Sequence, residues 1–214
     1  MTQWIPRLLD GLAMTAQATI ASFALAVLVS FVVGLGSRMR TLRPFFRIYV
    51  EVFRGTSALV QIFYFFYVLP LVGVQLSPLV AGVSALGLNF GAYGSEIVRG
   101  AMEAVPRGQY EASVALSMPR WLAIRRVILP QAVRTMIPPF GNILVDLMKT
   151  TALLSMISVG DLAFVGKQVL QSEGSAVMAY LPVMVLYFAF AVLLGRGTHR
   201  IEQLVGRGWS EATT

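Results

Sequence analysis

Long runs of uncharged, mainly apolar residues alternate along this chain with short segments that are rich in arginine. Residues 11–37 carry no charged side chain, and residues 55–95 form a second uncharged run of 41 residues. A helix needs about 20 apolar residues to cross a bilayer. The first run is therefore expected to form one membrane span. The second run is too long for one helix and is expected to form two.

Proline and glycine positions divide the pattern into spans. Leu69-Pro70, Gly73 and Ser77-Pro78 interrupt the second run, and two further apolar segments follow it. Residues 1–10 are expected to lie at the interface on the outer side, and residues 207–214 to form a tail on the opposite side. The predicted fold class is an all-α membrane protein with five transmembrane helices, at about 11–36, 57–74, 79–102, 130–156 and 176–195.

The segment between the third and fourth spans is polar and carries Arg120, Arg125 and Arg126. Each such charge costs about 2.5–3.5 kcal/mol at the centre of a membrane helix, so this segment is expected outside the bilayer. Good helix formers and proline placement predict two short helices joined at Ser117–Met118, with apolar surface that needs a partner. The chain is expected to turn back into the membrane at Pro130.

Composition and charge agree with a membrane protein and indicate its orientation. The chain is 57% hydrophobic and 13% charged, against about 25% charged residues in soluble domains. Its net charge of +7 does not indicate nucleic-acid binding, because the basic residues lie at span ends rather than in one stripe. Of the 17 arginines and lysines, all except Arg7, Lys149 and Lys167 lie in three segments that are expected on one side of the membrane. These segments are residues 38–54, 99–134 and 196–207. The positive-inside rule therefore places the polar segment and the C-terminus in the cytoplasm and the N-terminus outside.

Ionisable residues inside the fourth span are candidates for a solute path. Asp146 and Lys149 are three positions apart and are expected to share a helix face. Ionisable groups at this depth usually face a protein interior or a water-filled path, which would suit a zwitterion. A structural pair that only sets the rotation of the helix is an equal alternative. Pro138-Pro139 is expected to bend or unwind this span, and Asn142 and Thr150 lie one turn from Asp146.

The third span carries Gly87, Gly91 and Gly94, a spacing that lets two helices approach closely, inside one subunit or across a dimer. Asn89 and Tyr93 lie between these glycines and join the candidate path.

Other features of the chain are interpreted as structural. Glu96 and Arg99 are expected to form an ion pair, and the run Phe63–Tyr67 to face lipid and pack rather than bind a cation. His199, the only histidine, is expected to be a solvated or headgroup-level residue.

The chain shows no set of residues that would make it an enzyme. Gly160–Lys167 has five residues between its glycines and is followed by Gln168, whereas a P-loop needs four residues and then Ser or Thr. No zinc-protease motif or Ser–His–Asp set is present either. No cofactor or metal ion is therefore expected in this chain.

The polar segment resembles the EAA loop of the permease subunits of type I ABC importers. The family pattern is matched by Glu111-Ala112, Gly108-Gln109 and Ile128-Leu129-Pro130. Ser113 stands at the third position of the Glu-Ala-Ala pattern, where the family has Ala, and Ser117 stands where the family has Gly. That Gly permits a left-handed turn, so the bend between the two short helices could differ in detail here.

The resemblance extends over nearly the whole chain, with residues 11–206 as the transmembrane domain and 106–128 as the coupling loop. Within the family, the chain is most similar to the polar amino acid uptake branch. The residues that carry this similarity are Glu51–Thr56, Gly91–Tyr93, Glu96 and Arg99-Gly100. The strings at 54–61 and 104–109 are most similar to permeases of ectoine and hydroxyectoine importers. This implies import of a small zwitterion, either ectoine or, as the alternative, a polar amino acid of the Arg, His, Gln or Glu type.

The family also implies partners and site residues. These are a cytoplasmic ATPase dimer that binds the ATP, a second related permease, and a solute-binding protein that docks on residues 71–77 and 158–175 outside. The implied location is the bacterial inner membrane. A membrane scaffold without transport is the alternative from another class, and a secondary carrier is disfavoured because no inverted repeat is evident. The expected coupling residues are Gly108, Gln109, Tyr110, Glu111, Ala112, Ser113, Leu116, Ser117, Met118, Trp121 and Arg125. The candidate path residues are Asn89, Tyr93, Asn142, Asp146, Lys149 and Thr150.

Overall fold

The computed structural model describes residues 4–210, and the side chains of residues 4–205, and all regular structure in this part of the chain is helical. The expected outer N-terminus and cytoplasmic tail fall partly outside it, at residues 1–3 and 211–214. The α-helices are α1 (Ile5–Gly36), α2 (Arg43–Gly55), α3 (Ala58–Phe63), α4 (Pro78–Glu103), α5 (Arg107–Ala115), α6 (Arg120–Ala123), α7 (Leu129–Thr150), α8 (Leu162–Glu173) and α9 (Ala176–Ser210).

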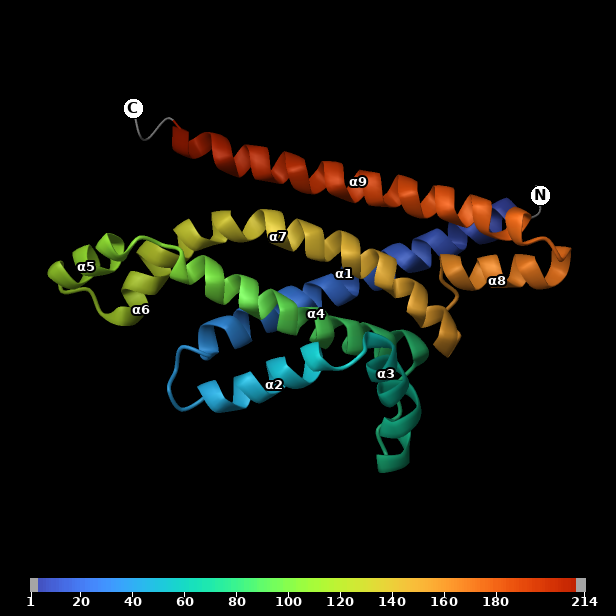
Figure 1. Cartoon of the computed structure of the whole chain (residues 1–214), viewed down its shortest axis with the longest axis horizontal. Coiled ribbons are helices and arrows are strands. Elements are labelled where there is room, and N and C mark those ends of the chain that lie inside the picture. Colours follow the sequence, from blue (N-terminus) through green and yellow to red (C-terminus); the bar gives the residue numbers. More distant parts are fainter. Residues whose placement is uncertain (1–3, 211–214) are drawn as a thin grey trace.

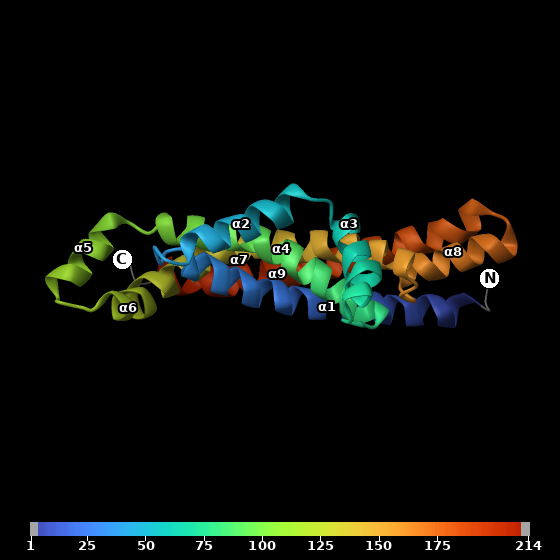
Figure 2. The ribbon, with the colours of Figure 1, turned by 90° about the horizontal axis from the view of Figure 1, so that it is seen from below.

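The molecule is an elongated helical bundle. Helices α1, α4, α7 and α9 run along its length, and α2 lies beside α4 (Figure 1). The short helices α5 and α6 lie at one end together with the end of α9, whereas α8 and the start of α1 lie at the other (Figures 1 and 2). The start of α1 and the end of α9 therefore lie at opposite ends of the bundle, as expected for a chain with an odd number of spans.

Helices α1 and α4 form the main contact at the core of the bundle. Small residues allow these two helices to approach closely. A Cβ atom at Gly87 would lie 2.5 Å from Leu25, and one at Gly91 would lie 2.7 Å from Val29. The Ser30 hydroxyl also donates a hydrogen bond to the Gly91 carbonyl at 3.2 Å. The glycine face predicted on the third span therefore serves helix packing inside this chain.

Within the described part of the chain, three helical stretches are long and apolar enough to cross a membrane, namely Ile5–Gly36, Arg120–Ile157 and Ala176–Val205. The pair α2 and Ala58–Val72, bent by 105°, would add a fourth. Helix α4 has the length of a span but is less apolar than these three stretches, and 13 of its 26 residues are buried. The count of five spans stays a prediction.

Two expected interruptions take a different form. The second span is not one α-helix, since α3 continues as a π-helix at Tyr64–Val68 and a 3-10 helix at Leu69–Val72. The fourth span does not start as a new helix at Pro130, where the chain was expected to turn back into the membrane, and it does not unwind at Pro138-Pro139. Arg120–Ile157 is one helical stretch that contains all three prolines. Part of it is a π-helix, Ile124–Ile128, and its end is a 3-10 helix, Thr151–Ile157.

Residues 158–175, predicted to form an outer docking segment, are largely the helix α8. Its N-cap is Asp161, whose Oδ1 accepts a hydrogen bond from the Phe164 backbone N–H at 2.9 Å. Gly174 ends it in a left-handed conformation.

Candidate functional site

The polar segment folds as predicted into two short helices, α5 and α6, joined at Ser117 and Met118. The Ser117 N–H donates to the Val114 carbonyl at 2.8 Å, and the Met118 N–H donates to the Ser113 carbonyl at 3.0 Å. This pair of bonds closes a helix through a residue in the left-handed region, usually glycine. Ser117 adopts that conformation with φ 52°, so the serine makes the turn for which glycine is preferred.

The two-helix loop, residues 106–128, is anchored to the end of α4. The Tyr110 hydroxyl donates to the Met102 carbonyl at 2.9 Å, and the tyrosine ring packs against the cluster that contains Val98, Met102 and Ile128. Ser113 is buried, and its hydroxyl donates to the Gln109 carbonyl at 2.7 Å. Motion of the loop would therefore be transmitted to α4 and α7.

The outer side of this loop is apolar and unusually exposed. Val114 and Leu116 are each 75% exposed, and Trp121 is 61% exposed. Glu111 and Arg125 are exposed beside them. Of the other expected coupling residues, Gly108, Gln109, Ala112 and Ser117 are exposed, Tyr110 and Met118 are half-buried, and only Ser113 is buried. The loop thus presents an apolar tip with flanking charges, as a docking element requires.

Asn89 does not line an open path. Its Nδ2 donates to the Phe53 carbonyl at 2.9 Å and to Gln61 Oε1 at 3.1 Å, and its side chain is buried. Gln61 Nε2 in turn donates to Phe53 O at 2.9 Å and to Thr56 Oγ1 at 2.7 Å. This network fastens α4 to the bend between α2 and α3. Sequence reasoning missed Gln61, since a single glutamine in an apolar run gives no periodic signal.

Tyr93 lies at the surface of α4, where the Arg54 guanidinium carbon is 5.1 Å from its ring centroid. The cation–π contact therefore occurs here and not in the aromatic run of Phe63–Tyr67, whose phenylalanines pack against the core. Glu96 and Arg99 form the predicted ion pair at 2.7 Å, and Glu103 joins it at 2.9 Å.

Asp146 and Lys149 form the predicted pair, with Oδ1 and Nζ 3.6 Å apart. Both side chains are largely exposed, at 67% and 61%, and exposed Asn142 shares their face of α7. The Thr150 hydroxyl instead donates to the Asp146 carbonyl at 2.7 Å. The exposed side chains of Asn142, Asp146 and Lys149 form the polar stripe of α7, and they point away from the rest of this chain. A path along them would need a second chain opposite.

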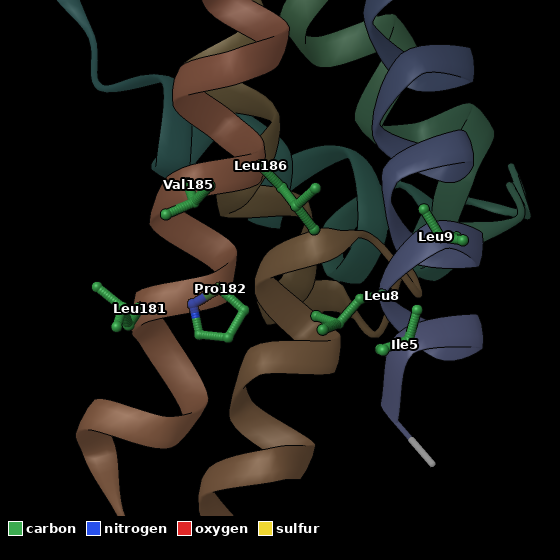
Figure 3. A pocket seen from close by; sticks show the side chains of 7 residues that line it. All are labelled: Ile5, Leu8, Leu9, Leu181, Pro182, Val185 and Leu186. Atoms are coloured by element: carbon green, nitrogen blue, oxygen red, sulfur yellow. The ribbon is translucent and has the colours of Figure 1, made fainter. Parts of the chain in front are cut away.

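An apolar groove lies between the start of α1 and α9. It encloses about 410 Å³, and Figure 3 shows the side chains of Ile5, Leu8, Leu9, Leu181, Pro182, Val185 and Leu186 around it. None of these side chains can bind an ammonium or carboxylate group. The groove therefore does not suit a zwitterionic solute.

Asp161 is a buried carboxyl that sequence reasoning missed. Burial raises the pKa of Asp161 to about 7, and the Phe164 and Ala163 backbone N–H groups oppose this. Its Oδ2 has no hydrogen-bond partner among the described residues. Beside it, Thr15 Oγ1 accepts from the Leu162 N–H at 3.1 Å, which ties α1 to the start of α8. Asp161 differs from an ordinary N-cap residue only by its burial, and the burial depends on the tertiary structure.

Known proteins share this fold and sequence pattern. Residues 26–203 match a family described as the inner membrane component of binding-protein-dependent transport systems. The "Probable amino-acid ABC transporter permease protein y4tF" of Sinorhizobium fredii is 42% identical over 92% of this chain and 86% of its own length. The "L-cystine transport system permease protein TcyB" of Bacillus subtilis is 37% identical over 94% and 88%. A crystal structure of an amino acid ABC transporter with histidines superposes with a TM-score of 0.87 at 30% identity, over 95% of this chain and 96% of the other.

Proposed function

This chain belongs to the family of inner membrane components of binding-protein-dependent transport systems, and we propose that it is a permease subunit that imports a polar amino acid. It is a subunit of an ABC importer and not itself an enzyme. The energy for uphill transport must then come from a separate ATPase.

The observation that carries the proposal is the exposed apolar tip of the two-helix loop. Val114, Leu116 and Trp121 expose more than half of their surface at an end of the bundle that is rich in arginine. A charged segment cannot lie in lipid, so these side chains need a protein partner. A cytoplasmic ATPase that binds the tip would move α4 and α7 through Tyr110, which bonds to α4 and packs on the cluster that α4 and α7 share.

Relatives support an amino acid rather than ectoine as the solute. Two similar permeases are named for an amino acid and for L-cystine, and the superposed structure is an amino acid transporter. An Asp–Lys pair offers one group of each sign, which matches the ammonium and carboxylate of an amino acid. Residues 54–61 and 104–109 are similar to permeases of ectoine importers, so ectoine is the competing solute in the test.

The polar stripe of α7 supports pairing with a second permease. Asp146 and Lys149 are exposed in the last third of a helical stretch, Arg120–Ile157, that is apolar enough to span the membrane. Charged groups at membrane depth face a bundle interior or water rather than lipid. A second permease opposite α7 would enclose the stripe and form the solute path between the two chains.

The test is uptake into vesicles that contain this chain, its partner permease, the ATPase and the binding protein. Labelled ectoine and arginine, histidine, glutamine, glutamate and cystine are offered with and without internal ATP. ATP-dependent accumulation of an amino acid is expected. Accumulation of ectoine alone would contradict the proposed solute, and no accumulation despite ATP hydrolysis would favour the scaffold interpretation.

The variant Glu111→Lys tests the role of the loop in the same vesicles. Reversing an exposed charge beside the apolar tip should disrupt ATPase docking, lowering uptake at least about tenfold while the protein stays in the membrane. Glu202→Lys is the matched control, since Glu202 is exposed on α9 near the same end of the bundle. Equal uptake by both variants would remove the loop from the coupling mechanism.

A further inference from the structure

A cleft of about 870 Å³ lies between the end of α1, helix α2 and the last turns of α4. It lies toward the end of the bundle that carries the two-helix loop (Figure 1). The charged side chains that line it are three glutamates and six arginines: Glu51, Glu96, Glu103, Arg38, Arg40, Arg43, Arg47, Arg54 and Arg99. The cleft therefore has an excess of positive charge, which its walls focus.

Two of the arginines form ion pairs with all three glutamates. Arg47 pairs with Glu51 at 2.8 Å, and Arg99 pairs with Glu96 at 2.7 Å and with Glu103 at 2.9 Å. The remaining four arginines have no carboxylate partner within the part of the chain whose side chains are described.

Two of these four arginines make weaker contacts. Arg38 lies 3.4 Å from the Tyr110 hydroxyl, and Arg54 lies over the Tyr93 ring. Arg40 and Arg43 have no polar partner among the described residues and are exposed. Guanidinium groups without a partner match the geometry of a phosphate, which they can bind with two parallel hydrogen bonds.

Helix α2 indicates where such a phosphate would come from. Its charged residues Arg43, Arg47 and Glu51 line the cleft, whereas Phe45 and Ile48 on the opposite face are 68% and 62% exposed. A helix with arginine on one face and large apolar residues on the other is typical of the boundary between lipid headgroups and acyl chains. Such a helix places a charged cleft and an apolar surface beside the same lipid layer.

We propose that this cleft binds the phosphate group of an anionic phospholipid. The guanidinium groups of Arg40 and Arg43 contact the phosphate, and the acyl chains lie along Phe45 and Ile48. The cytoplasmic leaflet is the anionic one, and the arginine-rich end of the bundle faces it under the orientation expected from the positive-inside rule. Because Arg38 joins the cleft to Tyr110, bound lipid also supports the base of the two-helix loop.

The binding test is native mass spectrometry of the assembled transporter, titrated with dioleoylphosphatidylglycerol or with dioleoylphosphatidylcholine. The double variant R40Q/R43Q should weaken phosphatidylglycerol binding about tenfold or more, because two charge-assisted contacts are lost. The matched control is R196Q/R200Q, which removes the same charge from exposed positions on α9 outside the cleft. The control should change the affinity less than about twofold.

The outcomes are distinguishable. Tight binding of phosphatidylglycerol over phosphatidylcholine, lost in R40Q/R43Q only, supports the proposal. Equal binding of the two lipids, or equal loss in both double variants, would overturn it. A third arm adds inorganic phosphate, and full displacement of the lipid at millimolar phosphate would overturn the lipid assignment in favour of a free-anion site. None of these results depends on which solute is transported.

Discussion

At the scale of single residues, two serines take a conformation that usually requires glycine. Ser117 ends α5 with φ 52°, and Ser158 follows the 3-10 helix after α7 with φ 63°. The same hydrogen-bond pattern closes both turns. The Val159 N–H donates to the Leu154 carbonyl, just as the Met118 N–H donates to the Ser113 carbonyl. A left-handed conformation costs a residue with a Cβ atom about 1–2 kcal/mol, so each turn is held by its surroundings.

Substitutions at Ser117 test whether the left-handed turn sets the shape of the loop. Ser117→Gly should stabilise the turn by about 1 kcal/mol and keep full uptake, whereas β-branched Ser117→Val should lower uptake severalfold. ATP-driven uptake and ATPase binding are measured. Ser158→Val is the control, because it strains the same type of turn at the opposite end, and it should leave ATPase binding unchanged. ATPase binding retained by Ser117→Val would show that the turn is not required.

The buried carboxyl of Asp161 makes stability depend on pH. Because the native pKa of Asp161, about 7, lies above the ordinary value of 3.8 for an aspartate, the native state holds this proton more tightly than the unfolded state. Its contribution to stability is therefore complete below pH 3.8 and is lost as the pH rises through 7, by an amount on the order of 4 kcal/mol.

The variant Asp161→Asn isolates this effect. Asparagine is also a good N-cap and cannot ionise, so the variant should be more stable than wild type at pH 8, by a margin that shrinks as the pH falls and vanishes near pH 3.8. Thermal unfolding in detergent across this range measures the difference. Asp10→Asn, an exposed position on α1, should follow the wild-type profile. A constant difference between Asp161→Asn and wild type at all pH values would contradict the assignment.

At the scale of elements, each π-helix in the described chain immediately precedes a Leu-Pro pair. The Leu69 N–H bonds to the Tyr64 carbonyl before Pro70, and the Leu129 N–H bonds to the Ile124 carbonyl before Pro130. Proline lacks an N–H, and its ring collides with the carbonyl four residues earlier. A wider turn makes room for the ring, so the helix continues where a break was expected.

The variant Pro130→Ala tests whether this wide turn sets the position of α6. Alanine restores the missing N–H, so the segment can close as an ordinary α-helix. This would rotate α6 relative to α7 by about 100°, one residue of helix. The exposed Trp121 would turn with it, and uptake should fall about tenfold while the protein stays folded.

Pro70→Ala is the control for that variant, since it alters the other π-helix, which lies away from the two-helix loop. It should leave ATPase binding unchanged. If Pro130→Ala kept both uptake and ATPase binding, the wide turn would have no role in coupling.

At the scale of the whole molecule, two exposed faces of the bundle differ in kind. Helix α9 exposes Phe188 at 70% and Leu193 at 66%, as a lipid-facing helix would. Helix α7 exposes the polar stripe of Asn142, Asp146 and Lys149. Lipid can cover the first face but not the second, which supports the proposal that a second chain covers the polar stripe of α7.

Cysteine labelling tests this difference directly, because the chain has no native cysteine. In the assembled transporter, Asn142→Cys should react quickly with a water-soluble maleimide, and excess solute should slow the reaction. Leu193→Cys, the control in lipid, should stay unreactive. An unreactive Asn142→Cys would contradict a path along α7 and favour the scaffold interpretation.

A matching pair of substitutions asks whether the charge on α7 matters. Asp146→Ala should lower uptake about tenfold, and Asp146→Asn less, because the amide keeps the hydrogen bonds. If both variants took up solute at the wild-type rate, the Asp146–Lys149 pair would have a structural role and no role in transport.

The sequence by itself determined the helical class, the two-helix loop and the family. These depend on local quantities, since the length of an uncharged run, the cost of charge in lipid and helix propensity do not require knowledge of neighbours. The ion pair of Glu96 and Arg99 was also predictable, because residues three apart on a helix are neighbours whatever surrounds them.

Only the tertiary structure decided which polar residues are buried and which are exposed. Asn89 was expected on a path but is held by Phe53 and Gln61, and the glycines around it pack on α1. Asp161 is buried beside α1, and the arginine cleft is formed where α1, α2 and α4 meet. Burial and charge excess arise from segments distant in sequence, and no local pattern specifies which of them will meet.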